Sequence, residues 1–255
     1  MGRSILLTGD AGYIGSHLTP LLLERENIFR NADIARGLGN DFGDIRGESF
    51  DVVIHLAAHS SVTKSLADPD ECLDNNAFKL IPFLRNNDIG KLVFTSTGGA
   101  IYGEKHFAKE EDASWNGCIS PYGQSKYLAE QIIRRLHPNH TILRLGNVYG
   151  GDDEGRLELA AHARFRKDNP IVVYGGEQTR DFIHVDVVCE AILAAVYSDV
   201  VGTFNIGSGF ETRVTDLAET EGRVRCVPVR YAKARPGEIV NVSLDITKAQ
   251  KAGLL

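Results

Sequence analysis

Two side chains near the middle of the chain have the types and the spacing for acid–base chemistry. Tyr122 and Lys126 stand four residues apart, so a helix would place both side chains on one face. A free phenol has a pKa of about 10, and a nearby ammonium favours the phenolate and lowers that pKa toward the range of a useful base. The pair could remove a proton from a hydroxyl while hydride leaves the same carbon. The same spacing also fits an ordinary surface contact, so it proves little alone.

A cluster of hydroxyl side chains, Thr95-Ser96-Thr97, ends the apolar segment 91–96. If that segment is a strand of a parallel sheet, the cluster lies at the edge where ligands collect in such folds. A hydroxyl there could hydrogen-bond the oxygen that loses its proton. The alternative is a turn formed by small polar residues.

The first turn of the chain has the pattern of a phosphate site. A short apolar run at 5–8 predicts a buried strand, and Gly9, Gly12 and Gly15 follow it before an amphipathic segment from Tyr13 to Arg25. Glycines let the chain reverse tightly, let bare backbone approach a phosphate, and expose the N–H groups of the new helix. In a chain with 26 glycines the spacing alone is weak. Its place between a strand and a helix predicts a dinucleotide pyrophosphate site.

Asp33 follows this turn at about the distance, roughly 20 residues, at which a carboxylate can accept both hydroxyls of the adenosine ribose. That arrangement favours NAD over its 2′-phosphorylated relative, although Arg36 weakens the discrimination. The segment before Asp33 is polar and makes a poor strand, so a solvated loop carboxylate is the alternative.

The segment 51–58 is a convincing buried strand, but it begins too soon after Asp44 for a normal helical crossover. Either this edge of the sheet has been pared down or residues are missing from the chain. We therefore expect a break, disorder or a lost helix near residues 26–51.

The alternation of strands and helices predicts an α/β fold with a doubly wound parallel sheet of the Rossmann type and right-handed crossovers. Residues 1–150 would form the dinucleotide-binding domain. Residues 151–255 would form mostly a smaller mixed α/β substrate-binding lobe, with elements near 175–200 returning to the main domain. Further helices are expected at 69–86, 121–136 with Ser120 as N-cap, 157–166 and 185–197, and further strands at 91–96, 141–145, 171–174, 203–206 and 227–229.

The composition limits the classes of partner. A net charge of −6 and a pI near 5.8 argue against binding to a nucleic-acid backbone. The four cysteines are far apart without a C-x-x-C pair, so neither a zinc site nor a disulfide framework is predicted, and no metal is expected. With no leader and no membrane-length apolar run, we expect a cytoplasmic protein without a membrane partner.

The ordered set of motifs resembles the extended short-chain dehydrogenase/reductase superfamily over essentially the whole chain, and within it the NAD-dependent nucleotide-sugar epimerase/dehydratase family. The epimerases are its nearest match. The stretches that carry the resemblance are the glycine turn at 8–15, 43–46, 55–58, 95–97, 120–126, 144–150, 180–186, 204–207 and 235–238.

The resemblance implies a role for each matching position. Tyr122 would be the catalytic base, Lys126 would tune it and hold the nicotinamide ribose, and Thr97 would bind the reacting sugar hydroxyl. NAD would be held by Gly9, Gly12, Tyr13, Ile14 and Gly15 at the pyrophosphate, Asp33 at the ribose, Asp44 and Ile45 at the adenine, and Ala57 and Asn76 beside the cofactor. The nucleotide diphosphate of the substrate and its ribose would be held by Asn147, Arg180, Arg235 and Glu238.

The implied activity is epimerisation at C4 of a UDP-hexose, with UDP-glucose and UDP-galactose as the default pair, through a 4-keto intermediate. Gly98 and Gly99 stand where related 4,6-dehydratases place an Asp-Glu pair, so dehydration is not expected. The stretch also carries one residue more than many relatives before Tyr102, which leaves the register of the hydroxyl open.

Two other functions remain open at this point: another reaction on the same scaffold, such as a nucleotide-sugar reductase or decarboxylase, and a non-catalytic module that senses a dinucleotide. The resemblance also implies a homodimer through the helices near 70–86 and 121–136.

Overall fold

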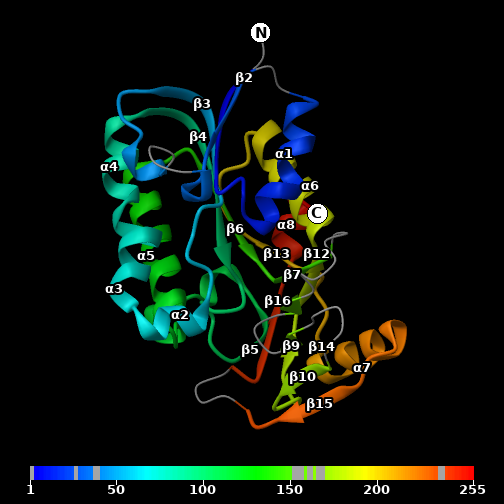
Figure 1. Cartoon of the computed structure of the whole chain (residues 1–255). Helices are drawn as coiled ribbons and strands as arrows, with labels where there is room; N and C mark the ends of the chain where they lie inside the picture. The colour runs from blue at the N-terminus through cyan, green and yellow to red at the C-terminus, as the bar shows by residue number, and fades with distance from the viewer. Residues whose placement is uncertain are drawn as a thin grey trace.

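The centre of the molecule is a six-stranded sheet in which every strand runs parallel to its neighbours (Figure 1). The computed structural model describes residues 3–25, 28–36, 41–150, 158–159, 163–164, 170–234 and 239–255. The sheet has the order β13-β6-β4-β3-β1-β2, with β1 at Ser4–Thr8, β2 at Ile28–Ala32, β3 at Ser49–His55, β4 at Asp88–Thr97, β6 at His140–Leu145 and β13 at Gly202–Ile206. The predicted doubly wound α/β fold is confirmed.

Helices cover both faces of this sheet, which is why its central strands are apolar on both sides (Figure 1). One face is covered by α1 (Tyr13–Leu23), α6 (Val185–Tyr197) and α8 (Thr247–Lys251), and the other by α2 (Val62–Ala67), α3 (Pro69–Leu73), α4 (Leu80–Asn86) and α5 (Pro121–Leu136). The strand order reverses between β1 and β3, and ligands of doubly wound sheets bind at the carboxyl ends of the strands at such a point.

The helix predicted at 69–86 is divided into three parts. Between α3 and α4 the chain forms a π-helical turn at Asp74–Phe78. A π turn takes an extra residue into the helical repeat and is common at functional sites. Here the buried Asn76 lies on this turn.

At the β2 edge of the sheet, the described residues include a strand that the sequence made doubtful and lack the helical crossover that the sequence predicted to be lost. The polar segment before Asp33 does form a strand, because its backbone pairs with β1 from Ser4 opposite Ile28 to Thr8 opposite Ala32. The lost helix is confirmed: the described residues between β2 and β3 contain two 3₁₀ turns, at Ile34–Arg36 and Phe42–Asp44.

Outside the main sheet, the described residues form short strands in small sheets together with helix α7. One four-stranded sheet has the order β15-β10-β9-β8 and another the order β14-β11-β16-β5, while β12 pairs with β7. The bounds are β5 Lys105–Ala108, β7 Asn147–Tyr149, β8 Glu158–Leu159, β9 Ala163–Arg164, β10 Ile171–Tyr174, β11 Thr179–Arg180, β12 Phe182–His184, β14 Thr212–Arg213, α7 Val214–Arg225, β15 Val229–Ala232 and β16 Asn241–Leu244.

Two predicted elements beyond residue 150 are wrong. The helix expected at 157–166 is replaced, at its described residues, by the antiparallel pair β8 and β9, since pairing with β10 overrides local helix propensity. The strand expected at 227–229 begins only at Val229, because the Val227 N–H donates to the Gly222 carbonyl and so belongs to the end of α7. The expected strand 203–206 is β13 of the main sheet, and the domain boundary at residue 150 stays a prediction.

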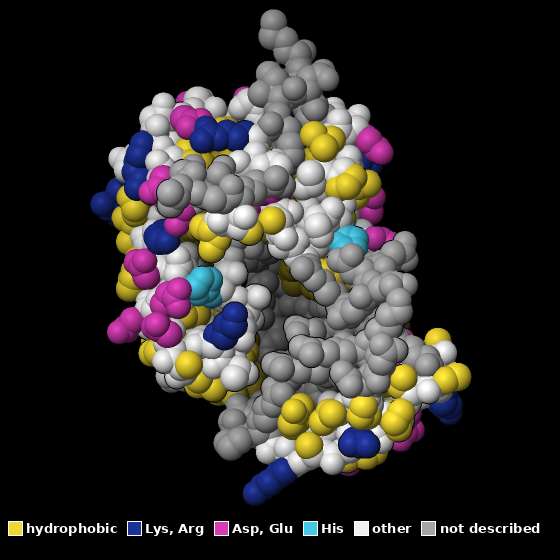
Figure 2. All heavy atoms as spheres, viewed as in Figure 1, with side chains coloured by type: hydrophobic (Ala, Val, Ile, Leu, Met, Phe, Trp, Pro, Cys, Tyr) yellow, Lys and Arg dark blue, Asp and Glu magenta, His cyan; other side chains and the backbone are white. Residues whose placement is uncertain are grey.

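The surface reflects this layout. Charged side chains of both signs gather on the side of α2 to α5, and the face in view is hollowed near its centre, above the lobe that carries β15 and α7 (Figure 2). None of the described helices is long and apolar enough to cross a membrane.

The close packing of the first turn makes a stability prediction. A Cβ at Gly15 would lie 2.2 Å from the Gly9 carbonyl oxygen, which is a backbone atom and cannot move aside. We expect Gly15→Ala to lower the free energy of unfolding by about 2 kcal/mol, measured by urea unfolding without cofactor. The control is Gly43→Ala, whose Cβ would meet only side-chain atoms of Asp41 and Lys79, at 3.3 Å, and should lose less than half as much. Equal losses would contradict this account.

Candidate active site

The glycine turn presents bare backbone at the switch point of the sheet. Gly9 has a φ of +77°, and a Cβ there would lie 2.6 Å from the Ala57 backbone nitrogen, so only glycine fits. Gly12 is the N-cap of α1 and provides no side chain to cap the first N–H groups. These N–H groups and the positive end of the helix dipole fit the pyrophosphate of a dinucleotide.

Asp33 lies against this turn. Its carboxylate accepts a hydrogen bond from the Ala11 N–H at 3.1 Å and another from the Ala35 N–H at 2.8 Å. Both bonds fix a carboxylate just beyond β2, next to the phosphate cradle, where an adenosine ribose would follow the pyrophosphate. The predicted neighbourhood of Asp33 and the glycine turn is therefore present.

The residues predicted beside the adenine differ in exposure. Ile45 is buried in the core formed with Phe42 and α4, so only its backbone can border a cofactor, while Asp44 keeps part of its surface exposed. The neighbouring Asp41 pairs with Lys79 at 2.8 Å, and its pKa is lowered although burial opposes the shift.

The loop after β3 is hydrogen-bonded to the side chain of Asn76 on the π turn. Its amide oxygen accepts from the His59 N–H at 2.7 Å, and its amide nitrogen donates to the His59 carbonyl at 3.0 Å and to the Ser125 hydroxyl at 2.9 Å. Asn76 therefore fastens the loop that carries Ala57 to helix α5.

Buried His55, at the end of β3, hydrogen-bonds the Thr8 hydroxyl at 2.7 Å. Burial lowers the pKa of His55 to about 3, so this imidazole is neutral at physiological pH. Thr8 in turn accepts from the Ala57 N–H at 3.3 Å, which ties the first turn of the chain to the loop after β3.

Helix α5 brings the candidate catalytic groups together. It begins at Pro121 with Ser120 as N-cap, whose hydroxyl accepts from the Gly123 N–H at 3.2 Å. The Tyr122 phenol lies near the Thr97 hydroxyl at the end of β4, close enough for that hydroxyl to act on its pKa. The contact identifies Thr97 as the hydroxyl beside the phenol, despite the extra residue before Tyr102.

The pKa values of Tyr122 and Lys126 differ from the expectation that the ammonium lowers the pKa of the phenol. Burial lowers the pKa of Lys126 to about 7, opposed by the negative charge of Glu130. Burial raises the pKa of the Tyr122 phenol to about 12, opposed by the hydrogen bond with Thr97. In the chain alone, desolvation therefore outweighs any effect of the ammonium, and the prediction of a lowered phenol pKa is wrong there.

The substrate side is partly defined. A Cβ at Gly99 would lie 3.4 Å from the Asn147 side-chain oxygen and 4.0 Å from the Thr97 hydroxyl, so these groups border one small space. A Cβ at Gly98 would lie 2.8 Å from the end of the Leu244 side chain, so a side chain there would have to displace Leu244.

Arg180 is buried and donates to the backbone carbonyls of Thr179, Ile239 and Val240 at 2.6–3.0 Å. Through these bonds it holds the segment that leads into β16. Its predicted role toward a diphosphate stays a prediction, and Arg235 and Glu238 lie outside the described residues.

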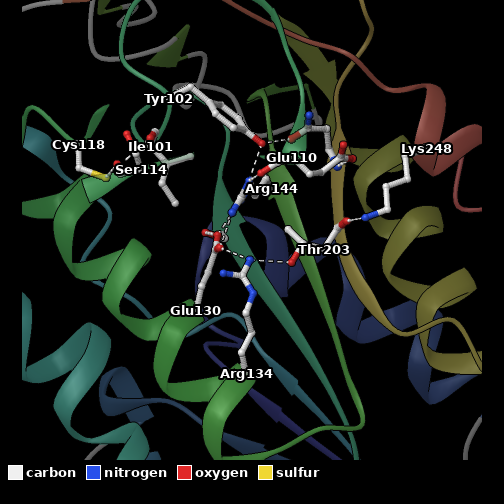
Figure 3. Close-up of polar contacts among 12 residues, drawn as sticks. Ile101, Tyr102, Glu110, Ser114, Cys118, Glu130, Arg134, Arg144, Thr203 and Lys248 are labelled. Atoms are coloured by element: carbon white, nitrogen blue, oxygen red, sulfur yellow. Dashed lines mark hydrogen bonds and ion pairs between the residues drawn. The ribbon is translucent and has the colours of Figure 1, made fainter. Parts of the chain in front are cut away.

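Sequence reasoning missed the charges beneath α5. Glu130 and Arg144 are both buried and form a salt bridge of 2.6 Å (Figure 3). One signal was present in the sequence: Glu130 stands one helical repeat beyond Lys126, on the stripe that also carries Tyr122.

Comparison with known proteins agrees with this geometry. The profile of the NAD dependent epimerase/dehydratase family matches residues 5–207, and the chain belongs to that family. It is thus an enzyme of the extended short-chain dehydrogenase/reductase type that uses NAD, as the motifs indicated.

Relatives cover nearly the whole chain. A Methanocaldococcus jannaschii protein with the provisional name UDP-glucose 4-epimerase is 34% identical over 98% of this chain and 92% of its own length. The structure of Thermotoga maritima UDP-glucose 4-epimerase with UDP-glucose is 29% identical with a TM-score of 0.79, covering 98% of this chain and 92% of that one. UDP-N-acetylglucosamine 4-epimerase from Methanobrevibacter ruminantium, in complex with UDP-N-acetylmuramic acid, is 26% identical with a TM-score of 0.82 and the same coverage.

The buried lysine makes a prediction about pH. Between about pH 7 and 10.5 the unfolded chain holds a proton on Lys126 that the folded chain releases, so stability rises with pH across this window. Below about pH 7 the folded protein carries a buried positive charge on Lys126, and this burial lowers the free energy of unfolding most there. We expect cofactor-free Lys126→Met to melt above the wild type at pH 6.5, with a gap that narrows toward pH 9.5. Thermal unfolding of both proteins measures the gap, and a gap independent of pH would contradict the assignment.

Proposed function

We propose that this protein is an NAD-dependent 4-epimerase of a UDP-hexose, with UDP-galactose and UDP-glucose as the default pair. The observation that carries the proposal is the placement of Tyr122 on α5 beside Thr97 at the end of β4, combined with the absence of acidic side chains at Gly98 and Gly99. The family membership and the relatives that act on UDP-sugars support it.

The chain's own groups would act at the C4 hydroxyl of the sugar. Thr97 would hydrogen-bond that hydroxyl and hold it against Tyr122, which takes the proton. NAD, when bound, supplies a positively charged ring that favours the phenolate and accepts hydride reversibly. Lys126, one helical turn away, would bind the ribose and hold positive charge near the phenol. After the 4-keto sugar turns over, C4 would regain the hydride from the reduced cofactor on its opposite face, and Tyr122 would return the proton to the C4 oxygen.

The space beside Gly99 and Asn147 bears on the choice of reaction. A 4,6-dehydratase needs acid–base side chains next to the hydroxyl-bearing residue to eliminate water, and the Leu244 side chain fills the place where a side chain at 98 would begin. Proton transfer at the sugar is left to Tyr122, which fits a reaction that starts and ends at one hydroxyl. UDP-galactose and UDP-glucose are proposed as the pair because the relatives at 34% and 29% identity carry the name UDP-glucose 4-epimerase.

Conversion of UDP-galactose tests this function directly. Purified protein with NAD bound should form UDP-glucose without consuming added nicotinamide, measured by separating the two sugars by chromatography. Tyr122→Phe removes the group that moves the proton and should lower kcat about 1,000-fold, near the middle of the range for loss of a general base, while retaining bound NAD. No conversion by the NAD-loaded wild type would refute the proposal, and stoichiometric use of NAD(H) would point to a reductase or decarboxylase instead.

A homodimer is also proposed. Helices α2 to α5 form one side of the molecule, where Leu66 on α2 is 62% exposed and Phe78 on the π turn is 47% exposed. Such exposed apolar side chains fit contact with a second copy across these helices. The cytoplasmic location stays a prediction of the sequence.

The dimer has its own test. Phe78→Asp places a charge on this surface and should shift the protein from dimer to monomer in sedimentation velocity, without changing its melting temperature by more than a few degrees. Phe210→Asp, at a side chain 74% exposed on the opposite lobe, is the control and should remain dimeric. A wild type that sediments as a monomer at micromolar concentration would exclude the dimer.

A further inference from the structure

The carboxylate of Glu130 is completely buried, and hydrogen bonds hold both of its oxygens (Figure 3). One oxygen accepts from the Ser96 hydroxyl at 2.6 Å and from Arg144 Nε at 2.9 Å. The other accepts from Arg144 Nη2 at 2.6 Å and from Arg134 Nη2 at 2.9 Å. A carboxylate with this many fixed donors has little freedom to move.

Two of these donors, Ser96 and Arg144, come from the strand ends that define the candidate active site, and Arg134 comes from α5 itself. Ser96 immediately precedes Thr97 on β4, and Arg144 lies on the adjacent strand β6, opposite Ser96 in the strand register. Glu130 itself lies on α5, one helical repeat after Lys126 and two after Tyr122. The carboxylate therefore joins the helix that carries the phenol to the strand that carries its hydroxyl partner.

The far side of Arg144 extends the network. Its Nη1 donates to the Tyr102 hydroxyl at 2.8 Å and to the Glu110 carbonyl at 2.6 Å. Tyr102 donates to Asn205 at 2.5 Å, and the Asn205 amide donates to the carbonyls of Ala108 and Asp245. Glu130 is thus coupled to β13 and to the segments around β5 and β16.

A buried ion pair is a costly way to hold a helix. Apolar residues of similar volume are often neutral or stabilising in its place, because both charges lose their hydration. Packing alone would not set the direction of α5 along the strand ends, whereas the three directed hydrogen bonds from Ser96 and Arg144 do. The Glu130 charge also acts on Lys126, whose pKa it raises against the effect of burial.

We propose that Glu130 is a positioning residue, which holds α5 against β4 and β6 and so fixes the Tyr122 phenol relative to the Thr97 hydroxyl. The proposal rests on the proposed epimerase function for its kinetic consequence, but its electrostatic consequence concerns the chain alone. Arg134 provides a matched control, since it makes the same kind of bond to Glu130 from a side chain that is 34% exposed.

The kinetic experiment compares three variants of the NAD-loaded protein. Glu130→Gln keeps the shape of the side chain but removes its charge, and the double variant Glu130→Met with Arg144→Met replaces the pair by apolar side chains. We expect Glu130→Gln and the double variant each to lower kcat for UDP-galactose about 100-fold, the loss typical of a misplacement of about 1 Å. Their KM and NAD content should stay within about two-fold of the wild type. Arg134→Met should leave kcat unchanged.

The second readout needs no substrate. Four proteins are melted between pH 5 and 9.5: the wild type, Lys126→Met, Glu130→Gln, and the double variant Glu130→Gln with Lys126→Met. The gap is the difference in melting temperature between a protein with Lys126 and its Lys126→Met counterpart, and it is measured once with Glu130 and once with Glu130→Gln. Without the carboxylate, Lys126 should lose its proton more readily, so the pH at which the gap between the two proteins begins to narrow should move down by at least about half a unit.

Both results together support the proposal. Either an unchanged kcat in the folded variants or an unchanged pH dependence of the melting gap overturns it. If no Glu130 variant folds while Arg134→Met does, the pair is purely structural and the proposal is likewise overturned. Should the wild type fail to convert UDP-galactose, the proposed function fails, and the pH dependence alone decides the role of Glu130.

Discussion

Charge buried beneath helix α5 is the constraint on which the candidate site depends. Lys126, Glu130 and Arg144 are each almost or fully inaccessible to water, and all three lie between α5 and the carboxyl ends of the central strands. Burying charge is expensive unless each group finds a partner. Arg144 and Glu130 satisfy one another, while Lys126 has the Phe94 ring at 4.1 Å and the more distant charge of Glu130. The lysine is therefore the group whose energy depends most on what occupies the site.

The two halves of the site meet because the sheet brings them together. The glycine turn follows β1, and the loop with Ala57 follows its neighbour β3. Thr97 ends β4, the next strand along, so the phosphate cradle and the Tyr122–Thr97 pair lie along one edge. Asn76 completes the arrangement from the π turn, by holding the loop after β3 to α5.

Much of this arrangement could be predicted from the sequence, wherever the signal was local. Helix α5 begins and ends where its N-cap and apolar pattern predict, and the glycine spacing identified the turn after β1. Local signals failed where pairing with distant strands decides the structure. Strand β2 is polar and is held by backbone bonds to β1, while residues 163–164 form a strand beside β10 and residues 158–159 pair with them in turn.

The buried network was also beyond local reasoning. Glu130 and Arg144 carry ordinary charged side chains in the sequence, and nothing in their spacing indicates that they meet. The pKa of Tyr122 shows a related limit: the sequence supplied the neighbouring ammonium, but only the structure shows the desolvation that opposes it. The spacing of Tyr122 and Lys126 in the sequence predicts that the two side chains can act together, whereas their burial, and its effect on their pKa values, follows only from the fold.

The central claim is that one hydroxyl-bearing carbon of a UDP-hexose is oxidised and reduced again within this site. Conversion of UDP-galactose that carries deuterium at C4 tests it most directly, with the product examined by mass spectrometry and proton NMR. The account predicts that UDP-glucose retains the deuterium at C4, with no loss to solvent, because the hydrogen never leaves the enclosed site. Product that has exchanged its C4 deuterium for solvent hydrogen would contradict it.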